Sequence, residues 1–244
     1  MSKSFAAEED FDRISSQQNF DYRTYHSNPK INNEALDSWI KYMPANHLDV
    51  DTRFGPITGL RTFGNKLVYW QSSATGLFSV NERTQITDNN NLPLILGTGG
   101  VLTRYDYVSQ QNGMHINQYA DTQSNAALYW FDYDKHELCM MAHDGSVAVL
   151  SKAKGVQNYL NKIADRGDLI DMPTLVYDSK FNEVLAYIGG DWDLYKKEYE
   201  EDYDRMKETV SLVYNENQQV FTAIYIIPIV ERCVFTNNLY IVGN

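Results

Sequence analysis

Two histidines and a cysteine lie close together in the middle of the chain, at His136, Cys139 and His143, with Asp144 beside them. Imidazole, thiolate and carboxylate groups are the ligands that zinc prefers. However, residues 136–142 have the composition of a β-strand, in which successive side chains point to opposite faces. Positions 136 and 139 would then face away from each other, and no fourth ligand is evident. We therefore expect no metal site and no metal cofactor.

Acidic side chains are the next candidates, because a pair of carboxylates performs the chemistry of most glycosidases. The candidates are Asp132, Asp134, Asp178, Glu183, Asp191 and Asp193. The first four occupy the polar turns of a repeated pattern, where Asp side chains accept hydrogen bonds from nearby backbone amides. The chain has no nucleophile-elbow pattern, and its five histidines are scattered. Turn geometry explains these acids better than catalysis does, so we expect no catalytic residue and no enzyme activity.

A glycine-rich stretch at residues 97–100 follows an apolar segment, as phosphate-binding loops do. It lacks the Lys-Ser/Thr pair of a P-loop, and it does not fit the dinucleotide-binding fingerprint. A sharp turn between two strands is the better interpretation, and no nucleotide cofactor is expected.

The composition disfavours several classes of protein. The chain has 244 residues and a net charge of −11, whereas a phosphate-binding face needs clustered Lys and Arg. Residues 1–10 lack the apolar core of a signal peptide, and no apolar run reaches the ~20 residues that span a bilayer. Having only Cys139 and Cys233 favours a reducing compartment, although a single bridge between them stays open. The 18 tyrosines suit half-buried sheets and protein interfaces.

One pattern recurs along the second half of the chain. Asp132 ends one run of aromatic and apolar residues, and Glu137 begins the next. Asp178 and Glu183 bound a second pair of such runs, with the same spacing between the two acids. A looser third copy covers residues 212–225. Aromatic and β-branched residues fill the runs and polar residues fill the turns, so each copy predicts a β-hairpin. Repeats of this spacing are typical of one supersecondary unit used several times, as in the blades of a β-propeller.

These patterns predict a mainly β protein of antiparallel repeated hairpins. Residues 1–53 form a polar segment with helices at 4–14 and 33–42. Residues 54–244 form the repeated β-sheet domain, interrupted at 189–208 by a charged insertion whose aromatic residues have helical spacing. The predicted strands include 57–63, 66–71, 76–80, 101–108, 127–132, 136–142, 146–150, 230–235 and 239–242.

Between these strands we expect a polar loop at 84–91, a long polar segment at 110–124, and a helix over 152–164 capped by Ser151. The insertion 189–208 is either a docking helix or lid, or a solvated excursion of a hairpin. The side chains that we expect to be largely buried are those of Tyr129, Phe131, Val176, Val213 and Phe221.

The number of blades limits how the fold can close. Propellers close with roughly four to eight blades, and blades of about 40 to 50 residues allow at most four after residue 54. The predicted fold is therefore propeller-like and incomplete, and the chain is either a fragment of a longer protein or closes by contact with other subunits. Its last hairpin has an uncovered edge, so we expect the isolated chain to self-associate or to have a loosely ordered edge over 210–242.

Three stretches of the chain together resemble one family of virus proteins. They are residues 54–60 with 65–70, then 97–107 with Asn117 and 128–152, and finally 177–184 with 213–216 and 221–225. In this order they look like the tail muzzle, or stabilisation, proteins of crAss-like gut bacteriophages, and more loosely like the β-propeller nozzle proteins of short-tailed phages. The resemblance covers residues 54–242, and the proteins of that family are much longer than this chain.

The resemblance implies a structural component of a phage virion tail, namely a muzzle, nozzle or stabilisation protein or a fragment of one. Such a protein acts by assembly and not by catalysis. Its implied partners are other virion tail proteins and copies of itself, with no nucleic-acid specificity and no membrane anchor. Its implied location is the virion tail, after synthesis in the cytoplasm of the bacterial host.

The alternative is a carbohydrate-binding or carbohydrate-cleaving β-propeller domain. Trp70, Trp130 and Trp192 could stack on sugar rings, and the acidic residues could perform the chemistry. Against this hypothesis, Trp70 and Trp130 lie within predicted strands, where we expect them in the core. An interaction module of a bacterial protein is the third hypothesis.

Overall fold

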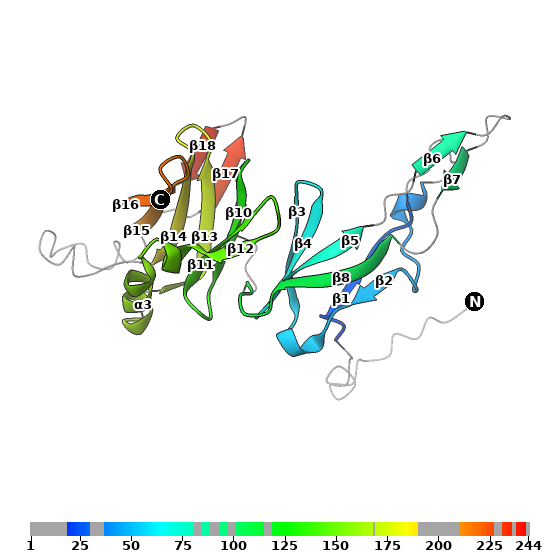
Figure 1. Cartoon of the computed structure of the whole chain (residues 1–244), viewed down its shortest axis with the longest axis horizontal. Helices are drawn as coiled ribbons and strands as arrows, with labels where there is room; N and C mark the ends of the chain where they lie inside the picture. The colour runs from blue at the N-terminus through cyan, green and yellow to red at the C-terminus, as the bar shows by residue number, and fades with distance from the viewer. Residues whose placement is uncertain are drawn as a thin grey trace, which may run out of the picture.

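The computed structural model describes residues 19–29, 37–80, 84–87, 93–96, 101–114, 119–167, 169–189, 210–226, 231–235 and 238–242 (Figure 1). Three four-stranded antiparallel sheets account for most of these residues. Within the same residues, no helix has the length and apolar character needed to cross a membrane.

The three large sheets are built alike. The first sheet has the order β3-β4-β5-β8 and comprises β3 (Ile57–Phe63), β4 (Lys66–Gln71), β5 (Thr75–Val80) and β8 (Leu102–Ser109). The second sheet, in chain order, comprises β9 (Asp121–Gln123), β10 (Ala127–Asp132), β11 (Glu137–Ala142) and β12 (Val147–Val149). The third sheet, also in chain order, comprises β13 (Leu169–Asp178), β14 (Glu183–Gly189), β15 (Val210–Asn215) and β16 (Val220–Ile226).

Smaller elements surround the sheets. The two-stranded pairs are β1 (Arg23–Tyr25) with β2 (His47–Asp49), β6 (Thr84–Thr87) with β7 (Pro93–Leu96), and β17 (Glu231–Phe235) with β18 (Asn238–Val242). The short helices are η1 (Ser38–Ile40), η2 (Thr52–Phe54), α2 (Leu150–Ala153) and α3 (Gln157–Asp165). The β6–β7 pair projects away from the large sheets at the upper right of Figure 1.

Strand β10 explains why the sheets stack. All six of its side chains are buried, so both faces of the second sheet are covered. Tyr129 and Phe131 belong to the core shared with the third sheet. Leu128 and Trp130 point the other way into the core shared with the first sheet, where the ring centroids of Trp130 and Trp70 lie 5.8 Å apart. Because side-chain direction alternates along a strand, one strand serves two cores.

The outer face of the first sheet is covered by the N-terminal segment. Tyr69 and Phe78 stack with ring centroids 4.3 Å apart and share a core with Val50. Within the covering segment, the Arg23 guanidinium donates two hydrogen bonds to the Asp49 carboxylate, at 2.6 and 2.8 Å, across the β1–β2 pair. This part of the N-terminal segment is therefore ordered against the β-sheet.

A mainly β, antiparallel fold is confirmed, and the strands predicted at 57–63, 66–71 and 127–132 match β3, β4 and β10 residue for residue. The described residues form no closed barrel or propeller. The predicted burial is confirmed for four side chains, whereas Phe221 is only half-buried on β16, an edge strand of the third sheet. The four buried side chains are Tyr129, Phe131, Val176 and Val213.

Two local predictions were wrong, and one strand was not predicted. Residues 84–91 were expected to be a loop, yet β6 lies within them. The polar segment 110–124, to which no strand was assigned, contains β9. The single helix predicted over 152–164 is two helices, because the chain turns at Gly155, whose φ of 80° is incompatible with a continuing right-handed helix. These errors share a cause, since short polar strands and a single glycine carry little periodicity.

The predicted N-terminal helices are not confirmed. Residues 4–14 lie outside the described residues, and so do 97–100 and 190–208. Of the second predicted helix, 33–42, the structure describes residues 37–42. They contain one 3-10 turn, η1, followed by extended backbone at Lys41. Its apolar side chains Trp39 and Ile40 are exposed, and a short helix that buries no apolar face gains little stability.

The stacking of sheets predicts a contrast between two phenylalanines. Phe131 is 0% exposed in the core between the second and third sheets, whereas Phe181 is 57% exposed. Phe131→Ala should lower the free energy of unfolding by about 3–5 kcal/mol because it leaves a cavity. The matched control Phe181→Ala should change it by roughly 0.5 kcal/mol or less. Urea denaturation of both variants measures this, and similar losses in the two would contradict the stacked arrangement.

Candidate functional site: a polar joint between two sheets

The copies of the sequence repeat share one kind of turn. In each copy, an Asp or Asn side chain that ends the first strand accepts a hydrogen bond from a backbone N–H within the turn; these residues are Asp132, Asp178 and Asn215. The last residue of each turn has a left-handed φ of 55–56°, at His136, Asn182 and Gln219. The predicted hydrogen bonds between Asp side chains and nearby backbone amides are therefore confirmed at Asp132 and Asp178.

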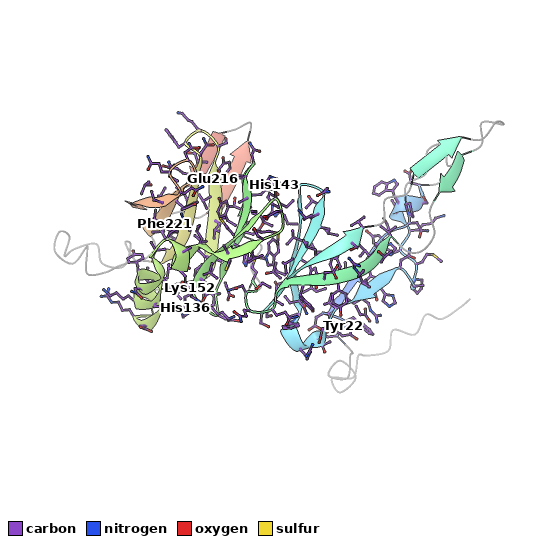
Figure 2. The ribbon with its side chains drawn as sticks, viewed as in Figure 1. Tyr22, His136, His143, Lys152, Glu216 and Phe221 are labelled. Atoms are coloured by element: carbon purple, nitrogen blue, oxygen red, sulfur yellow. The ribbon has the colours of Figure 1, made fainter. Side chains whose placement is uncertain are left out.

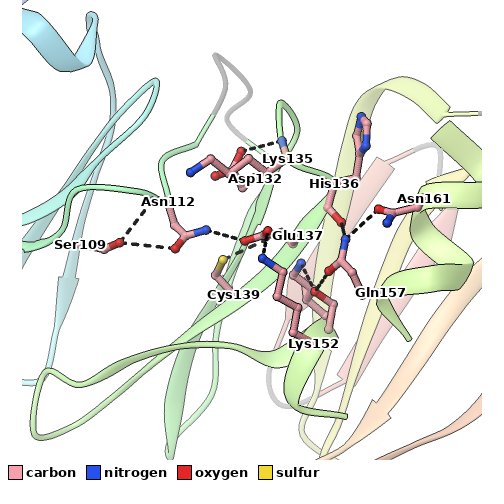
Figure 3. A network of polar contacts seen from close by, with 12 residues as sticks. Ser109, Asn112, Asp132, Lys135, His136, Glu137, Cys139, Lys152, Gln157 and Asn161 are labelled. Carbon is pink, nitrogen blue, oxygen red and sulfur yellow. Dashed lines mark hydrogen bonds and ion pairs between the residues drawn. The ribbon is translucent and has the colours of Figure 1, made fainter. Parts of the chain in front are cut away.

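The first of these turns also meets a strap from the first sheet. Residues 109–114 leave the end of β8 and reach the β10–β11 hairpin of the second sheet (Figure 3). The backbone N–H of Gly113 donates to Asp132 Oδ2 over 3.1 Å, and Asn112 Nδ2 donates to Glu137 Oε2 over 2.7 Å. We call these four residues the polar joint.

The polar joint is buried and closely packed. Asn112, Asp132 and Glu137 are 6%, 2% and 5% exposed. A Cβ on Gly113 would lie 2.3 Å from the backbone oxygen of Gln71 and 2.4 Å from the backbone of Ser72. Only a glycine lets the strap approach β4 this closely.

Further contacts anchor the joint on both sides. The Thr75 hydroxyl donates to the backbone oxygen of Asn112 over 2.7 Å, which ties the strap to β5 of the first sheet. On the side of the second sheet, Lys152 Nζ of α2 forms an ion pair with the other carboxylate oxygen of Glu137. The joint and its anchors therefore link four segments, namely β5, the strap, the β10–β11 hairpin and α2.

Burial changes the acid–base behaviour of this region. It raises the pKa of Asp132, and the two backbone N–H groups on the carboxylate only partly offset this effect. Burial also raises the pKa of Cys139 well above its ordinary value. The Cys139 thiol is therefore held in its neutral form, which is neither a good nucleophile nor a good metal ligand.

Other polar contacts connect neighbouring sheets. Arg61 of β3 pairs with Asp121 of β9 at 2.5 Å between Nε and Oδ2. The Tyr129 hydroxyl of the second sheet donates to Glu216 Oε1 beyond β15 over 2.7 Å. The pKa of Tyr129 is raised, first by burial and then by this carboxylate. Each pair of neighbouring sheets is thus fixed by a buried apolar core and by at least one polar contact.

Ser151 does not cap a helix as predicted. Its hydroxyl oxygen accepts the Leu138 backbone N–H over 3.2 Å and donates to Gln157 Oε1 over 2.6 Å. Gln157 Nε2 in turn donates to the His136 backbone oxygen and to Asn161 Oδ1. The side chain therefore fastens α2 and α3 to the turn of the second sheet.

The candidate metal ligands are dispersed. Figure 2 places His136 near α3 and His143 at the opposite end of the second sheet. The His143 ring stacks on Phe63, with ring centroids 4.4 Å apart, while Cys139 is completely buried in the core between the first two sheets. Among the described residues, no three His, Cys, Asp or Glu side chains are grouped to hold a metal ion. Cys139 is a free thiol, so the bridge to Cys233 that the sequence left open is not formed.

The carbohydrate hypothesis gains no support from the described residues. Trp70 and Trp130 are 1% and 0% exposed, so neither can stack on a sugar. The acids of the repeat are divided between hairpins of the second and third sheets, where Glu183 accepts a hydrogen bond from Asn215. Trp192, Asp191 and Asp193 lie outside the described residues.

Sequence reasoning missed the strap, because Asn112 and Gly113 fell in a segment identified only as long and polar. An Asn-Gly pair is a turn signal, and it was the one available indication that the backbone changes direction here.

Two comparisons with known proteins both find similarity to phage muzzle proteins. A family model described as Crassvirus muzzle protein matches residues 4–242. The chain is also similar to the muzzle protein of Bacteroides phage crAss001, with 25% identity over 128 residues. This match covers 52% of the chain but only 9% of that relative, so it spans a small part of the relative's length.

The raised pKa of Asp132 predicts a distinctive pH dependence. Because the native state holds the proton more tightly than the unfolded state, the contribution of Asp132 to stability should rise as the pH falls from 7 toward the ordinary carboxyl range near ~4. Asp132→Asn should lower the free energy of unfolding by about 1–3 kcal/mol, since one backbone N–H loses its acceptor. The stability gap between wild type and Asp132→Asn should then widen as the pH falls.

Asp144→Asn is the control of opposite sign. Hydrogen bonds from the side chain and backbone of Ser146 lower the pKa of the exposed Asp144. The contribution of Asp144 to stability is present above the ordinary carboxyl pKa and is lost below it. The difference in stability between wild type and Asp144→Asn should therefore shrink on acidification. Urea denaturation at a series of pH values measures both gaps. A gap for Asp132→Asn that shrinks in parallel with the control would contradict the burial argument.

Proposed function

The chain belongs to the Crassvirus muzzle protein family, and from this premise we propose that it is a structural component of a phage virion tail that acts by assembly. The observation that carries the proposal is the extent of the family match, from residue 4 to residue 242. The match to a muzzle protein of a crAss-like phage supports the same role.

The construction of the sheets supports a mechanical role. Buried cores lie on both faces of the second sheet, and polar contacts such as Arg61 with Asp121 and Tyr129 with Glu216 fix its neighbours. Close-packed interiors of this kind have low compressibility and transmit strain. The stack is suited to serve as a stiff wall in an assembly.

We further propose that the three sheets are blades of an incomplete propeller. Each sheet begins with β3, β9 or β13, and contacts join these first strands at one side of the stack. Arg61 on β3 pairs with Asp121 on β9, and the backbone N–H of Leu175 on β13 donates over 2.9 Å to the oxygen of Tyr119, just before β9. First strands that converge in this way are what blades around a common axis require.

The proposed partners are other virion tail proteins and copies of this chain. Several large apolar side chains of the N-terminal segment are exposed, and aromatic residues and Met are enriched in protein interfaces. They are Phe20, Tyr25, Trp39, Ile40, Tyr42 and Met43, between 42% and 65% exposed. These side chains are the surface on which the proposed assembly would dock.

The test of the proposed function is made on intact phage particles. Peptides of this chain should be recovered from purified, protease-washed virions at a constant ratio to total particle protein. Gold-labelled antibodies raised against the folded chain should mark the tail in electron micrographs. The chain's absence from purified particles, or labelling confined to the head, would contradict the proposal.

A further inference from the structure

The polar joint contains the only Asn-Gly pair in the sequence, Asn112-Gly113. In such a pair the backbone nitrogen of the glycine can attack Cγ of the asparagine, because glycine has no Cβ to obstruct ring closure. We propose that this pair is a self-modifying site, at which the folded chain closes a succinimide ring at residue 112 and water then opens it to Asp or isoAsp. This inference goes beyond the proposed structural function.

The attacking atom has a base and an activating donor in place. The N–H of Gly113 points to Asp132 Oδ2 at 3.1 Å, so this carboxylate is positioned to take the proton. The Thr75 hydroxyl donates over 2.7 Å to the carbonyl oxygen of the same peptide bond. This hydrogen bond withdraws electron density from the peptide and makes its N–H more acidic. A carboxylate whose pKa is raised by burial is also a stronger base.

The atoms of the Asn112 side chain that would accept the attack and leave also have partners. The Ser109 hydroxyl lies 3.4 Å from Asn112 Oδ1 in a donating arrangement, and this contact can shorten as charge develops on that oxygen. The departing Nδ2 lies 2.7 Å from Glu137 Oε2. Lys152 is paired with the other oxygen of Glu137, which fixes the position of this carboxylate beside Nδ2.

The reaction balances without any external oxidant or reductant. Gly113 N loses its proton to Asp132 and forms a bond to Asn112 Cγ. The bond between Cγ and Nδ2 then breaks, Nδ2 takes up a proton from water and departs as ammonia, and Asp132 returns its proton to water. The chain loses the mass of one ammonia, and it gains the mass of one water when the ring opens.

The product would alter the joint. Ring opening leaves a carboxylate at position 112 beside Asp132 and Glu137, which are both buried. Buried like charges repel one another and are poorly solvated. The modification therefore weakens the contact between the first and second sheets at one defined place.

The test follows the intact mass and the peptide map of the full-length chain during incubation at neutral pH. The same chain unfolded in urea is the reference for the intrinsic rate of the Asn-Gly pair. Modification at Asn112 should be at least ~10-fold faster in the folded chain, since a single positioned acid or base contributes about 10²-fold or more. Asn65 and Asn125 serve as internal controls and should stay unmodified over the same period.

Variants separate the proposed chemistry from simple unfolding. Asp132→Asn and Glu137→Gln should each slow the reaction of the folded chain by on the order of 10²-fold, with no effect in urea. Asp134→Asn removes an exposed acid from the same turn and should leave the rate unchanged. Near-ultraviolet circular dichroism checks that each variant is folded.

Two results would overturn the inference. A rate of modification at Asn112 in the folded chain that is equal to or slower than the rate in urea would mean that the joint protects Asn112. A persistent loss of ammonia with Lys152 joined to residue 112 in the peptide map would mean that the lysine amine, and not Gly113, is the nucleophile.

Discussion

The structure depends on the burial of both faces of one strand. β10 has no exposed side chain, so the second sheet cannot be stable unless a sheet packs on each side of it. The side chains of Tyr129 and Phe131 are buried against the third sheet. Those of Leu128 and Trp130 are buried against the first. The stack of three sheets follows from this requirement.

Apolar burial alone would not fix how the sheets are turned relative to one another, because the hydrophobic effect is not directional. The polar contacts, which are directional, fix the relative orientation of the sheets. Asp132 and Glu137 are held by the strap that leaves the first sheet, and Glu216 is held by Tyr129. Because an unpaired buried polar group is costly, each such contact excludes alternative arrangements of the sheets.

The sequence predicts those parts of the fold that are encoded locally. The hairpins around Asp132 and Asp178 follow from alternating side chains and from turn chemistry, and both are short-range signals. The strap at Asn112 and Gly113 could not be predicted, because its conformation depends on contacts with Gln71 and Asp132 that lie far away in sequence. The candidate site was missed for the same reason, since its residues converge only after the sheets have stacked.

Native-state hydrogen exchange on the full chain tests most directly whether the three sheets form one cooperative stack. Trp70→Leu changes only the core between the first and second sheets, where Trp70 meets Trp130. If the sheets depend on one another, the free energies of exchange of β10 and β14 amides should fall by the same amount. Loss of protection in β10 with unchanged protection in β14 would show that the third sheet is stable without the first, and would contradict this account.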